Sequence, residues 1–190
     1  MSNIKGKIIQ TIADLINDFG VYPDKYLTES DVRCLLFKKL MEYQEFNQLQ
    51  ETEDGSYSIP VHTEVRWYGE TGKLKWRSDI VILDVSTLRV KNGIFRLPSK
   101  GYGFYKPLAI IEIKLRRVNG SSDHMLIKKV REDIDKLKEI KTELPGDYYR
   151  YLVILDKKKN IEQIVKTLGR GEGIKLCYKY SNNNHQTIRS

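Results

Sequence analysis

A short apolar run with two charges near its end, Leu108–Leu115, limits the folds open to this chain. Six of its eight residues are apolar and three are isoleucine, which is typical of a strand buried on both faces. Side chains alternate along a strand, so Glu112 and Lys114 project from the same face. Burying a carboxylate and an ammonium is costly unless they pair or hold an ion. The run therefore predicts a central strand that carries a polar site.

A second strand that is predicted to be buried carries an acid in a similar way. Asp79 opens the apolar run Ile80–Leu83 within residues 74–84. Two such strands, each with a carboxylate, predict a site that holds a hard cation through oxygen ligands. The lysine beside Glu112 indicates chemistry on phosphate.

The composition fits a single domain that spans residues 1–190. Hydrophobic residues make up 40% of the chain, an ordinary share for a globular core. The two cysteines form neither a disulfide framework nor a metal-binding spacing. No apolar stretch is long enough to cross a membrane, and the first residues lack the apolar segment of a signal peptide. These features predict a cytoplasmic protein with no membrane partner.

The charge balance favours a polyanionic partner. The formal net charge is +8 and the isoelectric point is about 9.3, so nucleic acid is the partner that the composition favours. The 25 acidic residues exclude a simple basic tail.

The first half of the chain is predicted to hold two helices and two strands. Apolar residues recur at helical spacing over residues 4–19, and a capping-box-like start at Thr28–Asp31 opens a second helix. Val61–Trp67 alternates strictly, so its odd-numbered residues are expected on one face of a strand. A short turn then leads into the strand of Asp79.

Residues 85–107 are predicted to be an insertion between the two acid-bearing strands. Within it, Asn92-Gly93 is a strong turn signal. A hairpin is therefore expected between Leu88–Val90 and Ile94–Leu97.

The second half is predicted to alternate strands and helices. Ser121 or Ser122 can cap a helix of about 20 residues. A strand over 149–155, a helix over 161–168 and a strand over 173–180 follow, and the tail 181–190 is expected to be frayed. A helical crossover after the Glu112 strand implies parallel pairing, whereas short turns imply antiparallel pairing. The chain is therefore predicted to be an α/β domain with a mixed sheet flanked by helices.

This combination resembles the PD-(D/E)XK nuclease superfamily, which includes restriction endonucleases and archaeal Holliday-junction resolvases. The resemblance rests on Glu29 in a leading helix, Arg77-Ser78-Asp79 in a strand and Glu112-Ile113-Lys114 in the next core strand. It covers residues 28–155. It implies a restriction-endonuclease-like core of order αβββαβ, with an extra N-terminal helix and a C-terminal αβ extension. The chain departs from the family name at Ser78, where that name has proline.

The resemblance implies roles for five residues. Asp79 and Glu112 would ligate Mg²⁺ or Mn²⁺ together with the backbone carbonyl of Ile113. Lys114 would position or activate the attacking water and stabilise charge on the phosphorane. Glu29 would bind a metal directly or through water. A metal lowers the pKa of bound water, and Mg²⁺ needs only one or two protein carboxylates.

Five further residues are candidates for contacting nucleic acid. Arg77 lies two residues before the acid of its strand, and Lys128 lies about one turn into the long helix. Lys100, Tyr102 and Lys106 belong to a loop of glycines, aromatics and lysines that could follow a phosphate backbone or stack on bases. The same loop could equally tuck its aromatic rings onto the core.

The candidate site residues also have purely structural interpretations. Glu112 and Lys114 could be an ion pair on a half-exposed sheet face, and Asp79 could cap a strand end. Glu29 could serve only the helix dipole. Glu64 is expected on the solvated face of its strand, and reaches the site only if that face lines the cleft.

The sequence thus predicts a divalent-metal-dependent endonuclease, with DNA favoured over RNA and a homodimer as an option. The alternatives are a non-catalytic nucleic-acid-binding or assembly subunit with a nuclease-like fold, and an enzyme on a small phosphorylated substrate. Duplex, junction and single-stranded substrates stay open.

Overall fold

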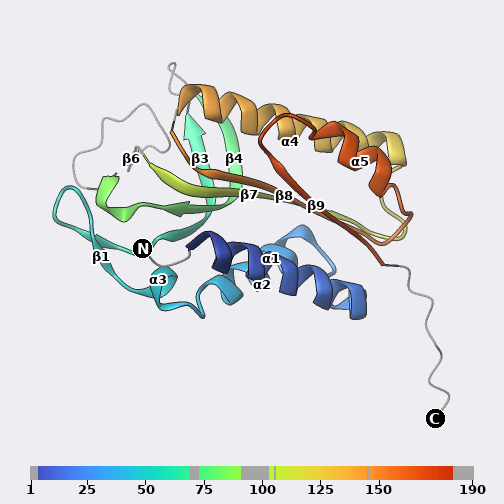
Figure 1. Ribbon diagram of the computed structural model, residues 1–190, viewed down its shortest axis with the longest axis horizontal. Coiled ribbons are helices and arrows are strands. Elements are labelled where there is room, and N and C mark those ends of the chain that lie inside the picture. The colour runs from blue at the N-terminus through green and yellow to red at the C-terminus, as the bar shows by residue number, and fades with distance from the viewer. Residues whose placement is uncertain (1–3, 69–72, 91–102, 105, 145, 182–190) are drawn as a thin grey trace, which may run out of the picture.

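A central five-stranded sheet of order β3-β4-β7-β8-β9 organises the molecule (Figure 1). The computed structural model describes residues 4–68, 73–90, 103–104, 106–144 and 146–181. The strands of this sheet are β3 (Val61–Tyr68), β4 (Leu74–Leu83), β7 (Pro107–Arg116), β8 (Tyr149–Asp156) and β9 (Lys175–Tyr180). β3, β4 and β7 pair antiparallel, whereas β7, β8 and β9 pair parallel. The predicted mixed sheet is therefore confirmed.

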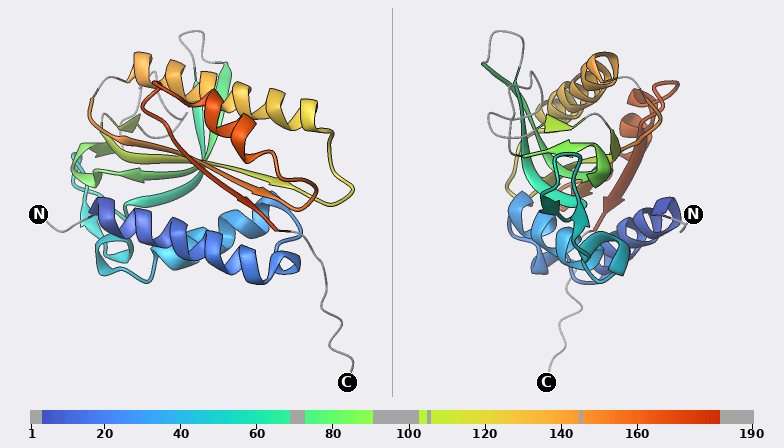
Figure 2. Two further views of the ribbon diagram at one scale, coloured as in Figure 1. Left: turned by 45° about the vertical axis from the view of Figure 1, so that its right-hand side comes forward. Right: turned by 90° about the vertical axis from the view of Figure 1, so that its left-hand side faces the viewer.

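Helices cover both faces of this sheet, as the two views of Figure 2 show. One face carries α1 (Ile4–Val21) and α2 (Glu29–Leu40), and the other carries α4 (Asp123–Glu143) and α5 (Glu162–Leu168). The smaller elements are the 3₁₀ turns η1 (Pro23–Lys25) and η2 (Val85–Thr87), α3 (Gln44–Asn47), and the strand pairs β1 (Gln50–Glu51) with β2 (Tyr57–Ser58) and β5 (Leu88–Arg89) with β6 (Gly103–Phe104). None of the helices in the described part of the chain is long and apolar enough to cross a membrane.

Two hydrophobic cores lie on opposite faces of the sheet. The core under α1 and α2 takes Ile111 and Ile113 from β7, and the core under α4 and α5 takes Ile110 from the same strand. This alternation explains why the β7 sequence is nearly continuously apolar, because both of its faces are covered. β7 is thus the centre of the fold.

The predicted helix starts form as the sequence indicates. The Thr28 hydroxyl accepts a hydrogen bond from the Asp31 backbone N–H at 3.2 Å, and the Asp31 carboxylate accepts one from the Thr28 N–H at 2.8 Å. This reciprocal pair is a capping box. At α4, the Ser122 hydroxyl accepts from the Met125 N–H at 3.3 Å, so Ser122 is the N-cap. Both caps fix the direction in which a helix enters the region of the predicted site.

One expectation about β3 is wrong. Val61 lies in the core under α1 and α2, whereas Val65 and Trp67 lie in the core under α4 and α5. The strand therefore changes face near its middle. Glu64, between these groups, has a φ of 57° and is the one non-glycine residue with positive φ in the described part of the chain. A left-handed residue breaks the simple alternation of a strand.

In the described part of the predicted insertion, β5 pairs with β6. Leu88 pairs with Phe104 and Arg89 pairs with Gly103. The proposed partner strand Ile94–Leu97 lies outside the described residues, as does the tail from residue 182.

Candidate active site

The candidate site lies at a fork where β4 and β7 separate. The two strands pair from Leu83 with Pro107 to Ile80 with Ile111, and no further. Beyond that point β4 continues beside β3 alone, and β7 continues beside β8 alone. Asp79 and Glu112 are the first residues past the last pair, so the fork opens between these two carboxylates.

Asp79 bridges the two arms of the fork. Its Oδ2 accepts a hydrogen bond from the Ile113 backbone N–H at 2.8 Å. Its Oδ1 accepts from Arg33 Nη1 of α2 at 3.1 Å. The backbone hydrogen bonds between β4 and β7 end before this point, so the Ile113 N–H has no β4 carbonyl opposite it. The Asp79 carboxylate accepts its hydrogen bond instead. Asp79 is therefore held in place by backbone and by charge.

Glu112 is a buried carboxylate with one oxygen unused. Its side chain is 1% exposed, and Oε2 accepts from Lys136 Nζ of α4 at 2.6 Å. Oε1 is buried and has no hydrogen-bond partner among the residues that the structure describes. Burial raises the pKa of Glu112 to about 7, opposed by the Lys136 ammonium and reinforced by the carboxylates of Asp79 and Asp133. Such an acid binds a proton or a cation readily near neutral pH.

Lys114 lies beside Glu112 on β7 and is held as an ammonium. Its Nζ donates to the Ile113 carbonyl at 3.2 Å and pairs with Asp133 Oδ2 of α4 at 2.8 Å. Burial by itself lowers the pKa of Lys114, but the carboxylates of Asp133 and Glu29 outweigh it, and the net pKa is raised. Lys114 therefore stays protonated at neutral pH.

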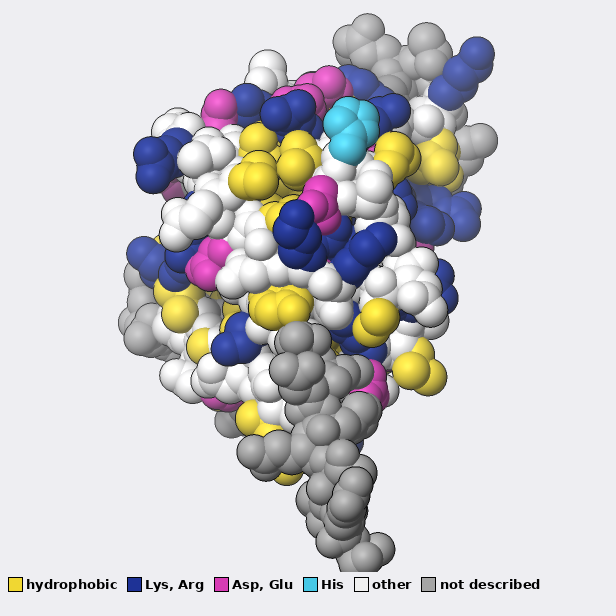
Figure 3. Space-filling view, turned by 90° about the vertical axis from the view of Figure 1, so that its right-hand side faces the viewer, with side chains coloured by type: hydrophobic (Ala, Val, Ile, Leu, Met, Phe, Trp, Pro, Cys, Tyr) yellow, Lys and Arg dark blue, Asp and Glu magenta, His cyan; other side chains and the backbone are white. Residues whose placement is uncertain are grey.

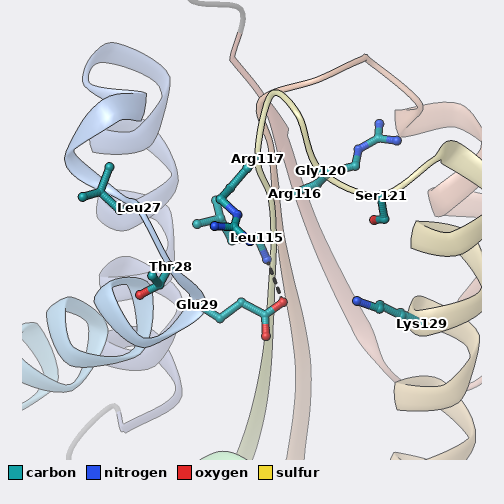
Figure 4. A pocket seen from close by; sticks show the side chains of 9 residues that line it. All are labelled: Leu27, Thr28, Glu29, Leu115, Arg116, Arg117, Gly120, Ser121 and Lys129. Atoms are coloured by element: carbon teal, nitrogen blue, oxygen red, sulfur yellow. Dashed lines mark hydrogen bonds between the residues drawn. The ribbon is translucent and has the colours of Figure 1, made fainter.

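Glu29 reaches the same stretch of β7 from the start of α2. Its Oε1 accepts from the Leu115 backbone N–H at 3.3 Å, the contact drawn as a dashed line in Figure 4. Asp79 bonds the Ile113 N–H and Lys114 bonds the Ile113 carbonyl. The structure thus brings the four predicted catalytic side chains together around residues 113–115.

Three charged residues of this site were not predicted from the sequence: Arg33, Asp133 and Lys136. Asp133 had a visible signal, because it occupies a position on the apolar stripe of α4, where a carboxylate needs a partner. It is 7% exposed, and its Oδ1 lies 3.2 Å from Lys136 Nζ. Arg33 follows Glu29 by four residues and so lies on the same side of α2.

Glu64 faces the fork rather than solvent. On β3, residue 63 pairs with Ile80 and residue 65 pairs with Ser78. Glu64, between them, therefore lies opposite Asp79 of β4. Its carboxylate forms an ion pair with Arg33 and another with Arg77, the second at 2.8 Å. The left-handed backbone at Glu64 aims the side chain at these arginines. Strained backbone of this kind clusters at functional sites.

The predicted nucleic-acid contacts fall in different places. The Arg77 side chain lies beside the fork and is 59% exposed. The Lys128 side chain is exposed, and its Nζ lies 4.0 Å from Glu132 on the same helix. Lys106 precedes β7 and pairs with Asp84 at 3.2 Å, about 20 Å from Glu112 at the rise of an extended strand. Lys100 and Tyr102 lie outside the described residues.

The carboxylates at the fork fit a hard cation that takes few protein ligands. Within the described residues, no group of three or more His, Cys, Asp or Glu side chains is placed to hold a metal ion. The fork nevertheless presents two carboxylates on facing strands, one with a buried oxygen that has no hydrogen-bond partner in the part of the chain that the structure describes. Mg²⁺ is commonly held by one or two carboxylates, with waters as its other ligands. The donor set therefore suits Mg²⁺ or Mn²⁺ better than Zn²⁺, which prefers histidine and cysteine.

Comparison of the chain with protein-family models, with curated proteins and with solved structures finds no match. Function is therefore inferred from the residues at the fork and their chemistry.

Proposed function

We propose that this chain is a divalent-metal-dependent nuclease that hydrolyses phosphodiester bonds, with DNA favoured over RNA. We further propose that its sheet and helices represent the restriction-endonuclease-like fold of the PD-(D/E)XK superfamily. The observation that carries the proposal is the fork, where Asp79 and Glu112 face each other and Lys114 lies beside them. The net charge of +8 supports a polyanionic substrate.

Asp79 and Glu112 would hold the cation. The Oε1 of Glu112, which has no hydrogen-bond partner among the described residues, the Asp79 carboxylate and the Ile113 carbonyl would be its protein ligands. A bound cation would lower the pKa of a water and neutralise charge on the phosphate. Glu29, at the mouth of the fork, would orient water beside the site.

Lys114 would stabilise the charge that develops on the phosphate oxygens. Its raised pKa keeps the ammonium charged, so it does not accept the proton of the attacking water. Asp133 holds the ammonium in a fixed position at 2.8 Å. A preorganised charge of this kind is typically worth about 10²–10³ in rate.

Cleavage assays with matched variants test the proposal. Purified protein is incubated with supercoiled plasmid, single-stranded DNA and RNA, each with Mg²⁺, Mn²⁺ or EDTA. Glu112→Gln removes one charge at the fork, and Asp135→Asn removes one from an exposed position of α4. We expect metal-dependent cutting that falls at least about 10²-fold in Glu112→Gln and is kept in Asp135→Asn. Cutting at the wild-type rate by Glu112→Gln would contradict the proposal.

One observation favours a second candidate, a nucleic-acid-binding subunit without catalysis. Lys136 Nζ lies 2.6 Å from the Glu112 carboxylate, and a lysine that balances this charge is compatible with a purely structural cluster. Such a subunit would bind DNA with a steep salt dependence and show no metal-dependent turnover in the same assays.

A further inference from the structure

A basic pocket adjoins the fork at the end of β7. It has a volume of about 340 Å³ and is lined by residues 27–29, 115–117 and 120–121 and by Lys129. Glu29 and Leu115 belong to both the pocket and the fork. Figure 4 shows Glu29 and Lys129 pointing into the pocket from opposite sides, from α2 and α4. A strand of nucleic acid whose phosphate lies at the fork would therefore pass this pocket.

Two cations of the pocket have no ion-pair partner among the described residues. Arg33, Lys114 and Lys136 at the fork all pair with carboxylates. In contrast, Arg117 and Lys129 form no ion pair with any residue that the structure describes, and both are exposed. Their positive field is therefore available to an anion from solution.

The turn that carries Arg117 is held by contacts of its neighbours. Arg116, directly before Arg117, has a fully buried side chain that donates to Asp156 at 2.9 and 2.5 Å and to Asp123 at 2.5 Å. Gly120 closes a tight turn by donating its N–H to the Arg117 carbonyl at 2.9 Å. A Cβ at Gly120 would come within 2.8 Å of that carbonyl oxygen, so the turn requires glycine. Arg117 is thus presented from a fixed backbone.

The wider surface at this end of the molecule also suits a polyanion. Figure 3 shows lysine and arginine side chains spread across the end at which α4 begins, with smaller groups of aspartate and glutamate between them. A phosphate that approaches the pocket is therefore attracted before it makes contact. The surface therefore attracts the phosphate, and the pocket holds it in place.

We propose that this basic pocket binds a second phosphate of the substrate strand, next to the phosphate at the fork, through Lys129 and Arg117. The pocket would fix the register of the strand, so that one phosphodiester lies between Asp79 and Glu112. This inference rests on the proposed function. The phosphate is either a strand end or an internal phosphodiester, and both present the same anionic oxygens.

Binding measurements in EDTA test the pocket without metal-dependent cleavage. Fluorescence anisotropy follows single-stranded DNA 12-mers that carry a phosphate at the 5′ end, at the 3′ end or at neither, over a range of salt concentrations. The variants are Lys129→Ala and Arg117→Ala. Arg131→Ala is the control, because it removes the same charge from an exposed position 200° around α4. Circular dichroism confirms that each variant is folded.

We expect Lys129→Ala and Arg117→Ala each to weaken binding about fivefold at 0.1 M salt and to lower the salt slope by about 0.7, the value for one single-strand phosphate contact. Arg131→Ala should bind like the wild type. If the wild type binds a 12-mer with a phosphorylated end more tightly, and Lys129→Ala does not, the pocket holds a terminal phosphate. If the variants lose the same affinity for all three 12-mers, the pocket holds an internal phosphate. Both results support a phosphate site in the pocket.

A different result is that the wild type binds and cuts DNA while Lys129→Ala and Arg117→Ala bind as well as Arg131→Ala does. That result would overturn the phosphate-binding role of the pocket and leave the proposed nuclease function standing. A wild-type protein that binds none of the 12-mers would also overturn the pocket, whereas the proposed function is tested separately by the cleavage assays on plasmid, single-stranded DNA and RNA.

Discussion

Glu112→Gln should change the pH dependence of stability in a defined direction. Burial raises the pKa of Glu112 from 4.5 to about 7, so the folded protein holds this proton more tightly than the unfolded chain does. Stability is then lost as pH rises from about 4.5 to about 7, at about 1.4 kcal/mol per pH unit for one group. Over that window the loss reaches about 3 kcal/mol. Glutamine has no proton to release and escapes this loss.

The assay is urea unfolding of both proteins in EDTA at several pH values from 4.5 to 8. The free energy of unfolding of the variant, minus that of the wild type, should rise by about 3 kcal/mol across the window and level off above pH 7. Taking the difference removes the titrating groups that do not interact with Glu112, and also the pH-independent cost of changing the partner of Lys136. Added Mg²⁺ should make the rise shallower, because a bound cation favours the ionised carboxylate.

A difference that stays flat within about 1 kcal/mol, or that falls with pH, would refute the reasoning. Glu112 would then be an ordinary carboxylate fully compensated by Lys136.

Three more perturbations test parts of the account. Ser78→Ala removes the acceptor of the Trp67 indole N–H, a buried hydrogen bond of 3.0 Å, and should cost about 1–3 kcal/mol in urea unfolding; an unchanged midpoint would show that the indole finds another acceptor. Asp156→Asn takes a charge from the buried Arg116 and should cost about 3–5 kcal/mol, seen as a lower melting temperature; an unchanged one would contradict the role of this pair. Lys136→Met removes the ammonium that lowers the pKa of Glu112, so the pH profile of cleavage should move to higher pH; a shift to lower pH would contradict this.

Much of the fold could be predicted because its signals are local. The apolar runs in β7 and β8, the cap at Thr28 and the periodicity of α4 each reflect short-range geometry. The parallel pairing of β7 with β8 followed from the long helical crossover between them. The convergence of Asp79, Glu112 and Lys114 also followed, because alternation and strand order fix where their side chains project.

The missing parts depend on tertiary placement. The change of face in β3 arises from one left-handed residue, Glu64, whose type gives no warning of positive φ. Lys136 and Arg33 lie on amphipathic helices, where a charged residue usually indicates a solvated face. Their role follows only from how α4 and α2 lie across the fork, which helix periodicity alone does not specify.

The most direct test is Mn²⁺ binding at the fork, measured by electron paramagnetic resonance of the free ion. We expect Asp79→Asn and Glu112→Gln each to lose binding that the wild type and the surface variant Asp135→Asn retain. Equal binding by the wild type and Asp79→Asn would contradict a metal site between these two strands.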